Sequence, residues 1–554
     1  MQLTGFGPRL CLVLLVAAIV VGSPLLSQTS EDVTILIRNV RPVATASEGE
    51  DAVVHILIKN GQLKLVTQDR IASSKADIGL DAQNGVLLGD LTLGEPASFL
   101  ILDEDPSENI DVLLDTATHA RFAIAKGEIA RNYLASIRDE EEVGKRKWLA
   151  YTPPPFAAPL SQQHEERWNR FDTRAVSGIF IAAVVLDRQN WLYQDAESRE
   201  QVGDLDEYNR GEIRGFRFGL VGTLNFKRPW VYTFAGATNA FDKGFDTEKS
   251  DDITLFDYRL DIPFLERASI SLGKQKEPIS MERIMGGLYL PIFERTSVSD
   301  ALLPSRNVGF VLNGVVPNRR FTWAIGGFND WFDASQGFDE SASQVVGRIT
   351  GLPFISEDES NLFHLGLGVR YTDAKEGLRY RTDPEFNLSP VFVDTCVSDD
   401  DCLFDADSAT AIDLEASWRR GPFWLHGEYL RNNVAAPDSG DPVFYGYHIT
   451  SSWIVSKEMR VYNRRSAVFG PVPVARSVYQ KGWGALELAL RWSFLDLTDG
   501  EIAGGGISIL SAGLNWWLTP YFGCSLYYRT IELDRFGLVG NSDGMLVRVT
   551  LMLE

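Results

Sequence analysis

The stretch Gly482 to Leu495, GWGALELALRWSFL, decides the fold expected for this chain. As an extended strand it has two faces, because side chains alternate with a period of two residues. One face is apolar and carries Leu488 and Leu490, whereas the other carries Glu487 and Arg491. As a helix, the same stretch would place Glu487 and Arg491 one turn apart on a solvated face. This stretch alone therefore leaves strand and helix open.

Repetition of the pattern favours strands. Ser508 to Leu518 and Met545 to Leu553 also set apolar residues at alternate positions. Similar runs begin near Ala175 and number about sixteen, many with aromatic residues near their ends, as in the girdles of membrane barrels. A soluble β-sandwich also alternates but does not need so many such strands. The predicted fold is all-β: a transmembrane antiparallel β-barrel of about 16 strands, preceded by a small periplasmic β-rich domain.

Four segments are expected along the chain. Arg9 precedes the apolar run Leu10 to Val21, and small residues follow, which is typical of a secretory signal; a retained anchor is the alternative. Tyr133 to Trp148 is rich in charge and helix formers, and is either a solvated helix or one that associates between subunits. A proline-rich linker follows it. The predicted segments are a signal peptide at 1–27, a periplasmic β-rich module at 31–132, the helix and linker at 133–170, and the barrel at 171–554.

Charge and composition limit the partners. The formal net charge of the 554 residues is -22, which argues against nucleic acid because phosphate binding needs a basic surface. Cys396 and Cys402 bracket an acidic sequence, and an exported protein meets an oxidising compartment, so a disulfide is predicted. The loop Asp394 to Asp407 lacks the spacing of a Ca²⁺ loop, so a solvated loop is preferred to a cation site. The six histidines are scattered, and no metal or cofactor is predicted.

The N-terminal part resembles the small β-sandwich that amidohydrolases build from both ends of their chain. The residues that carry this resemblance are Gly94, Asp103, Asp105, Pro106 and the AKGEI turn at 125–129. The resemblance implies metal-binding histidines on a large catalytic barrel, whereas this segment has only His55 and His119 and no His-x-His pair. A module without catalytic activity is therefore expected, and no enzyme activity is predicted.

A second resemblance runs from the linker to Glu554. Leu272 to Gly309 contains GxxKEPxSxER, then FER, then PSRNVG, and resembles the phosphate-selective porin O and P family; the closing portion from Val468 agrees. The resemblance implies a sixteen-stranded, trimeric outer-membrane pore with a long loop folded inward to narrow the channel. The chain departs from the family's pattern by ending in Glu554, where an aromatic residue is usual, and by having Gln275, where an aromatic residue is more frequent.

Two groups of cations are candidates for anion passage, because a permanently charged guanidinium has a planar donor fork that suits oxyanions. A row of such sites replaces the hydration shell of the passing anion, while each site binds weakly enough to release it. Acids share both regions, so pairing that stiffens the barrel interior is the alternative. Alternation places eight arginines toward the lumen: Arg217, Arg259, Arg348, Arg370, Arg419, Arg491, Arg529 and Arg548. In or beside the proposed constriction loop are Lys274, Lys276, Arg283, Arg295 and Arg306.

The predicted function is passive diffusion of small hydrophilic solutes, in particular anions such as phosphate, through an outer-membrane porin. The predicted partners are outer-membrane lipid, small anionic solutes and further copies of the chain in a homotrimer. The alternative is an outer-membrane anchor or structural envelope protein that displays the N-terminal module, and a periplasmic hydrolase is a third hypothesis. The sequence determines neither the solute nor the role of residues 31–132.

Overall fold

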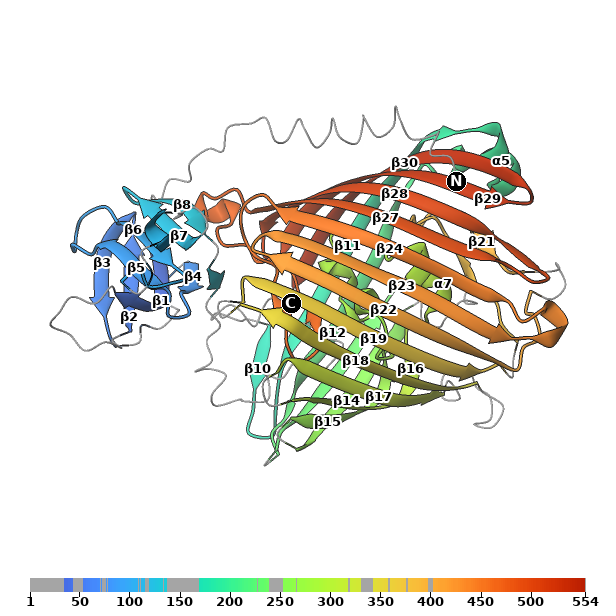
Figure 1. The fold of residues 1–554 in the computed structure, drawn as a ribbon, viewed down its shortest axis with the longest axis horizontal. Helices are drawn as coiled ribbons and strands as arrows, with labels where there is room; N and C mark the ends of the chain where they lie inside the picture. Colours follow the sequence, from blue (N-terminus) through green and yellow to red (C-terminus); the bar gives the residue numbers. More distant parts are fainter. Residues whose placement is uncertain are drawn as a thin grey trace.

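In the computed structural model, the chain forms a long β-barrel and a smaller β-rich module, which is blue in Figure 1. Residues 1–33 and 137–168 are not described, so the predicted signal peptide and most of the predicted helix and linker lie outside the described residues. The structure describes residues 34–42, 53–136 and 169–553, apart from 70, 72–75, 77, 108, 110, 115–118, 133, 227, 239–252, 266, 317–318, 330–341, 357–358, 375–376 and 397–401.

Sixteen antiparallel strands close the barrel, because β11 pairs with both β12 and the last strand β30. The short β10 (Arg170–Asp172) pairs with the beginning of β11. The predicted fold class and strand number are confirmed. The barrel strands are β11 (Val176–Gln194), β12 (Gly211–Leu224), β13 (Trp230–Ala237), β14 (Thr254–Leu265), β15 (Ala268–Gln275), β16 (Asn307–Val315), β17 (Phe321–Asn329), β18 (Ser343–Ile355), β19 (Asn361–Asp373), β22 (Ser408–Arg420), β23 (Phe423–Ala435), β24 (Val443–Ile454), β27 (Ala485–Asp499), β28 (Ile502–Thr519), β29 (Phe522–Arg535) and β30 (Leu538–Leu553).

The apolar faces of these strands point outward and the polar faces inward. In β27, Leu490 and Trp492 are exposed, whereas Glu487 and Arg491 are buried. A water-soluble sandwich would bury the apolar face, but an apolar exterior is what a lipid surface requires. The helix alternative for this stretch is therefore wrong. No helix among the described residues has the length and apolar character to cross a membrane.

The connections differ between the two ends of the barrel. At one end they are mostly short, as at 421–422 and 520–521, with 455–484 as the long exception. At the other end several are long, including 276–306 and 374–407. Outer-membrane barrels generally have short periplasmic turns and longer extracellular loops.

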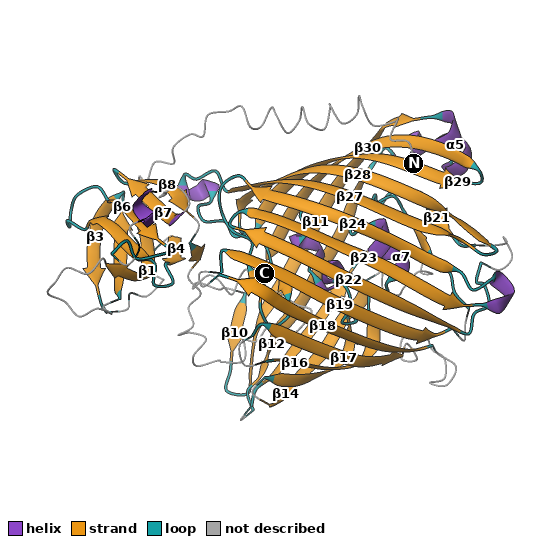
Figure 2. Ribbon diagram, viewed as in Figure 1, coloured by secondary structure: helices purple, strands orange, loops and turns teal. Residues whose placement is uncertain are grey.

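Three of the long connections turn into the barrel, and we call them loop A (276–306), loop B (374–407) and loop C (455–484). The helices of loop A lie inside the barrel wall (Figure 2). Ile279 and Phe293 of loop A share an apolar cluster with Phe386 of loop B and with Tyr527 of the wall. The interior elements are α6 (Met281–Ile284), η4 (Gly287–Tyr289), α7 (Ser297–Leu302), β20 (Arg381–Thr382), β21 (Val393–Asp394), β25 (Tyr462–Asn463) and β26 (Val468–Phe469). Loop C also contains η6 (Val478–Gln480), which has no buried residue.

The N-terminal module is β-rich, as predicted. Its apolar core contains Ile37, Ile56 and Phe122. Ala135 and Ser136 fall in the predicted helical segment but form β9, which pairs with β4. The module consists of β1 (Thr34–Pro42), β2 (Val54–Lys59), β3 (Gln62–Thr67), β4 (Ile78–Asp81), β5 (Val86–Asp90), β6 (Ser98–Leu102), α2 (Asp111–Leu114), β7 (Ala120–Ala125), β8 (Glu128–Asn132) and β9 (Ala135–Ser136).

The remaining short helices lie in connections of the barrel. They are α5 (Ala196–Val202) and η3 (Leu205–Tyr208) between β11 and β12, and η5 (Pro437–Ser439) between β23 and β24.

Candidate functional site

Most of the predicted lumen arginines are paired with acids. The Glu415 carboxylate accepts from Nε and Nη2 of Arg348 at 2.6 and 2.7 Å, a bidentate geometry that fixes both side chains. Arg217 lies opposite the buried Ala183, which places it on the inner face. The paired arginines brace the wall and the inner loops, which favours the scaffolding alternative for them. The other ion pairs are Arg259–Asp261, Arg370–Glu277, Arg491–Glu385, Arg529–Glu385 and Arg548–Asp187, and Arg419 donates to the carbonyl of Arg460.

Loop A is attached to the wall through buried carboxylates. Glu428 of β23 accepts hydrogen bonds from the Ser280 hydroxyl at 2.6 Å and from the Glu282 backbone amide at 2.8 Å. Ser280 also caps α6 by accepting from the Arg283 amide, which orients the first turn. Each contact joins a loop residue to an inward-facing strand residue, so loop A crosses the interior and does not extend into solvent.

A second attachment holds the middle of loop A. Arg214 of β12 and Arg548 of β30 donate to the Glu294 carboxylate at 2.7 and 2.6 Å. Burial alone would raise the pKa of the Glu294 carboxyl, but the two guanidinium groups hold it well below its usual range. Glu294 is therefore ionised at neutral pH and links loop A to both strands.

Four of the five predicted constriction residues form one group, which we call the cationic cluster: Lys276, Arg283, Arg295 and Arg306. The carbonyl of Met285 accepts from Lys276 Nζ at 2.8 Å and from Arg295 Nη2 at 2.9 Å, so these two cations are close neighbours. Lys274, the fifth predicted residue, lies in β15 and is buried.

The cationic cluster has fewer acidic partners than the wall arginines. Arg283 pairs with Asp300 at 3.0 Å and Arg306 with Asp257 at 3.1 Å, whereas the hydrogen bonds of Lys276 and Arg295 go to backbone carbonyls, which carry no formal charge.

Lys276, Arg283 and Arg306 are buried, and solvent reaches the cluster only at Arg295, which is partly exposed, and at the Asp300 side chain, which is 28% exposed. Burial lowers the pKa of the Lys276 ammonium well below its usual value, and the like charges of Arg295 and Arg306 lower it further. The neighbourhood is electropositive.

Loop C enters the barrel from the short-turn end, which the sequence analysis did not predict. Arg460 donates to the Glu487 carboxylate at 2.5 Å, and the Tyr462 hydroxyl lies 2.8 Å from Nδ1 of His364. The connection between β24 and β27 is longer than a turn requires, and this length was the available signal. The alternation of residues in the strands does not show whether such a connection folds into the barrel or away from it.

Glu458 of loop C gives a pH-dependent prediction. Burial raises the pKa of its carboxyl from 4.5 to about 7. Because the folded value is raised, its contribution to stability is fully present below pH 4.5 and is lost as the pH rises through about 7. We expect Glu458→Gln to increase the free energy of unfolding by on the order of 3 kcal/mol at pH 8, and to change it little at pH 4. Urea unfolding at both pH values measures this, with the exposed Glu200→Gln as control; an equal effect at both pH values contradicts the prediction.

The structure joins Cys396 and Cys402 of loop B in a disulfide, and Cys524 is free. The residues between the first two cysteines lie outside the described part of the chain. At the edge of the acidic loop, the Asp394 carboxylate accepts from Arg379 at 2.9 and 2.7 Å, which supplies that acid with a cationic partner from the protein.

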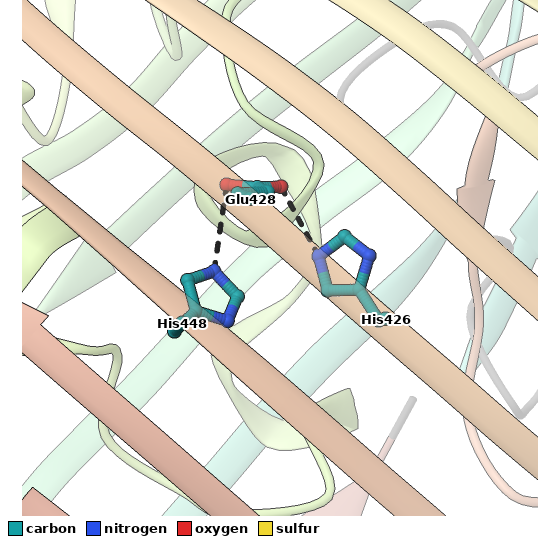
Figure 3. Close-up of side chains that lie close together, drawn as sticks. All are labelled: His426, Glu428 and His448. Carbon is teal, nitrogen blue, oxygen red and sulfur yellow. Dashed lines mark hydrogen bonds and ion pairs between the residues drawn. The ribbon is translucent and has the colours of Figure 1, made fainter.

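The structure also gathers residues that the sequence analysis treated as scattered. His426, Glu428 and His448 lie together on the inner face of β23 and β24 (Figure 3). The sequence held a signal, since His426 and Glu428 are two residues apart on one face of a strand. The position of His448 opposite Glu428 depends on strand register, which the sequence does not give.

A closed barrel with an apolar exterior and a polar, loop-filled interior defines a transmembrane β-barrel of the outer-membrane type. Residues 188–538, more than half of the chain, match the family model described as Phosphate-selective porin O and P. The chain therefore belongs to the phosphate-selective porin O and P family and is an outer-membrane porin.

Other similar proteins are distant. A Caulobacter vibrioides protein described only as uncharacterized is 23% identical over 291 residues, which cover 50% of this chain and 56% of that protein. The chain thus spans little more than half the length of this relative. Among solved structures, OmpT of Vibrio cholerae is 9% identical over 69% of this chain and 100% of its own, with a TM-score of 0.42. OprB of Pseudomonas putida is 9% identical over 68% of this chain and 94% of its own, with a TM-score of 0.43. An anion-selective porin from Comamonas acidovorans is 13% identical over 68% of this chain and 100% of its own, with a TM-score of 0.40.

Proposed function

We propose that this porin passes small anions by passive diffusion along a route beside the cationic cluster, and that loop A narrows this route. The observation that carries the proposal is the arrangement of Lys276 and Arg295, whose hydrogen bonds go to neutral carbonyls; Lys276 is buried, and Arg295 beside it is partly exposed to solvent. The paired arginines of the wall do not carry it, because their charge is largely compensated by acids.

The physics of a narrow passage favours this reading. Fixed charges beside a low-dielectric wall are screened less than surface charges, so they raise the local concentration of counter-ions. A guanidinium and an ammonium together replace part of the hydration of an oxyanion. Asp257 and Asp300 moderate the attraction, which leaves the site weak enough to release the ion. The family description makes inorganic phosphate the first anion to test.

The orientation and assembly are part of the same proposal. The chain enters the barrel at β10, beside the end with the short turns, and such turns are periplasmic in outer-membrane barrels. This supports a periplasmic location for the N-terminal module. A homotrimer is the assembly that we propose, to be checked by the mass of the detergent-solubilised protein.

Planar-bilayer recording tests the function. We expect stepwise, ohmic conductance from the purified protein. In a KCl gradient, the sign of the reversal potential should show that chloride permeates more readily than potassium. Added phosphate should reduce the chloride current. Because buried apolar side chains of loops A and B pack against the inner wall in one cluster, the second candidate is a barrel that only anchors the N-terminal module. Absence of conductance steps would favour that candidate, and a cation-side reversal potential would contradict anion passage.

The anion preference is also expected to depend on pH. Since burial and neighbouring cations lower the pKa of Lys276, its charge is lost at a pH below 10.5, where an exposed lysine would titrate. We therefore expect the reversal potential in a KCl gradient to move toward zero as the pH is raised in the range below 10.5. A Lys276→Met variant should show a smaller shift over the same range, and an identical shift in this variant would assign the effect to another group.

A further inference from the structure

His426, Glu428 and His448 lie in one buried group on the inner wall, and none of the three belongs to the cationic cluster. The strand register places Glu428 of β23 directly opposite His448 of β24. His426 is two residues before Glu428 on the same strand, so its side chain points to the same face. In Figure 3 both rings turn toward the carboxylate of Glu428.

The distances between the donor atoms fit a metal ion. Nε2 of His426 lies 3.2 Å from Oε1 of Glu428, and Nε2 of His448 lies 3.7 Å from Oε2 of the same carboxylate. Nε2 of His448 also lies 3.9 Å from Oε2 of Glu282 in loop A. Ligands about 2.0–2.2 Å from a tetrahedral Zn²⁺ ion are about 3.3–3.6 Å apart. The donor atoms of His426, Glu428 and His448 all lie within 4.8 Å of one another, so small movements would bring these three to one ion. The Glu282 carboxylate also accepts from the Thr296 and Ser299 hydroxyls and pairs with Arg491, so it would have to turn from these partners to reach the same ion.

Several buried polar atoms in this group lack a hydrogen-bond partner within the described part of the chain. Both ring nitrogens of His448, Nδ1 of His426 and both carboxylate oxygens of the neighbouring Asp413 are in this condition. At 3.7 and 3.9 Å, the contacts of His448 Nε2 are too long for hydrogen bonds. Unpaired buried polar groups are costly, so these atoms indicate a ligand that is neither a main-chain nor a side-chain group.

We propose that His426, Glu428 and His448 bind a divalent ion of the Zn²⁺ class, with Glu282 of loop A as the fourth ligand. Two imidazoles and carboxylates are a donor set that suits Zn²⁺, whereas Mg²⁺ and Ca²⁺ prefer oxygen ligands. The hydrogen bonds from the Ser280 hydroxyl and the Glu282 amide to Glu428 would orient the carboxylate, as outer-shell partners do in metal sites.

The ion would have a structural role. All four ligands are almost completely buried, and closed sites of this kind are structural in known zinc proteins. Because Glu282 belongs to loop A and the other three ligands to the wall, the ion would fix loop A against β23 and β24. This role does not depend on whether the pore selects anions.

Metal content of the full-length protein tests the proposal. The protein is refolded from denaturant into detergent with Zn²⁺ or Co²⁺, and free metal is removed. We expect about one Zn²⁺ per chain by elemental analysis and the visible absorption of tetrahedral Co²⁺. The double variant His426→Gln/His448→Gln should lower the affinity by at least about 100-fold. His364→Gln is the matched control, because His364 is also buried and faces inward, but both of its ring nitrogens have side-chain partners.

Two further measurements keep the test decisive if the double variant does not fold. Ser280→Ala keeps all four ligands and should lower the affinity by about 10- to 100-fold. For the native protein, the urea midpoint should rise with Zn²⁺, continue to rise with the logarithm of the free Zn²⁺ concentration above about one equivalent, and not respond to Mg²⁺. Less than about a tenth of an equivalent of bound Zn²⁺, or equal binding by a folded double variant, would overturn the proposal.

Discussion

Arg295→Gln is expected to lower the anion-to-cation permeability ratio of the pore by at least about fivefold, because a unit charge about 4 Å from a permeating ion contributes roughly 1 kcal/mol even at the dielectric constant of water. Arg295 belongs to the cationic cluster, is partly exposed and hydrogen-bonds to neutral carbonyls. Glutamine keeps an N–H donor for the Met285 carbonyl, so the substitution removes the charge while loop A keeps that contact.

Reversal potentials in a KCl gradient measure this effect. Arg199→Gln is the matched control, since Arg199 is an exposed arginine of α5 that pairs with Asp204. We expect the control to change the ratio little, because a charge in an open mouth is screened within about 10 Å at 0.1 M salt. An unchanged ratio in Arg295→Gln, with Arg199→Gln behaving as the native protein, would contradict the proposed route.

Arg548→Met is expected to lower the free energy of unfolding by about 3–5 kcal/mol. Arg548 and Asp187 face each other across the seam that closes the barrel, with bidentate contacts of 2.7 and 2.5 Å. Methionine fills much of the same volume but leaves the buried Asp187 carboxylate without this cation. The cost therefore comes mainly from an uncompensated buried charge.

Urea unfolding in detergent measures the loss. The double variant Asp187→Leu/Arg548→Met should recover part of it, because replacing both partners removes the unpaired charge. Arg199→Ala, which breaks the exposed pair with Asp204, should cost at most about 1 kcal/mol. Equal losses for the exposed and the buried pair would show that burial at the seam does not govern the energy of this interaction.

The charge of the inner face was predictable from the sequence, but the role of each charge was not. Alternation placed Arg348 and Arg491 on the inner side, and both are there. Their partners Glu415 and Glu385 come from a strand two positions away in the sheet and from loop B. Pairs of this kind depend on strand order and loop direction, which a pattern of alternation does not contain.

The cationic cluster and the histidine group show the same limit. The motif in loop A identified Lys276 and Arg295 as residues of one segment, but their shared contact with the Met285 carbonyl depends on how that segment turns inside the barrel. His448 became a neighbour of Glu428 only through the register of β23 and β24.

The sequence by itself determined that the chain forms a sixteen-stranded barrel with an apolar exterior, because each side chain's face follows from a backbone period of two residues. It also identified the family through the motif of loop A. Only the tertiary structure decided which charges are compensated and which are not, and that loops B and C enter the interior as well as loop A. The reason is that electrostatic interactions depend on distances between residues far apart in the chain, and those distances are fixed when the barrel closes and the loops pack within it.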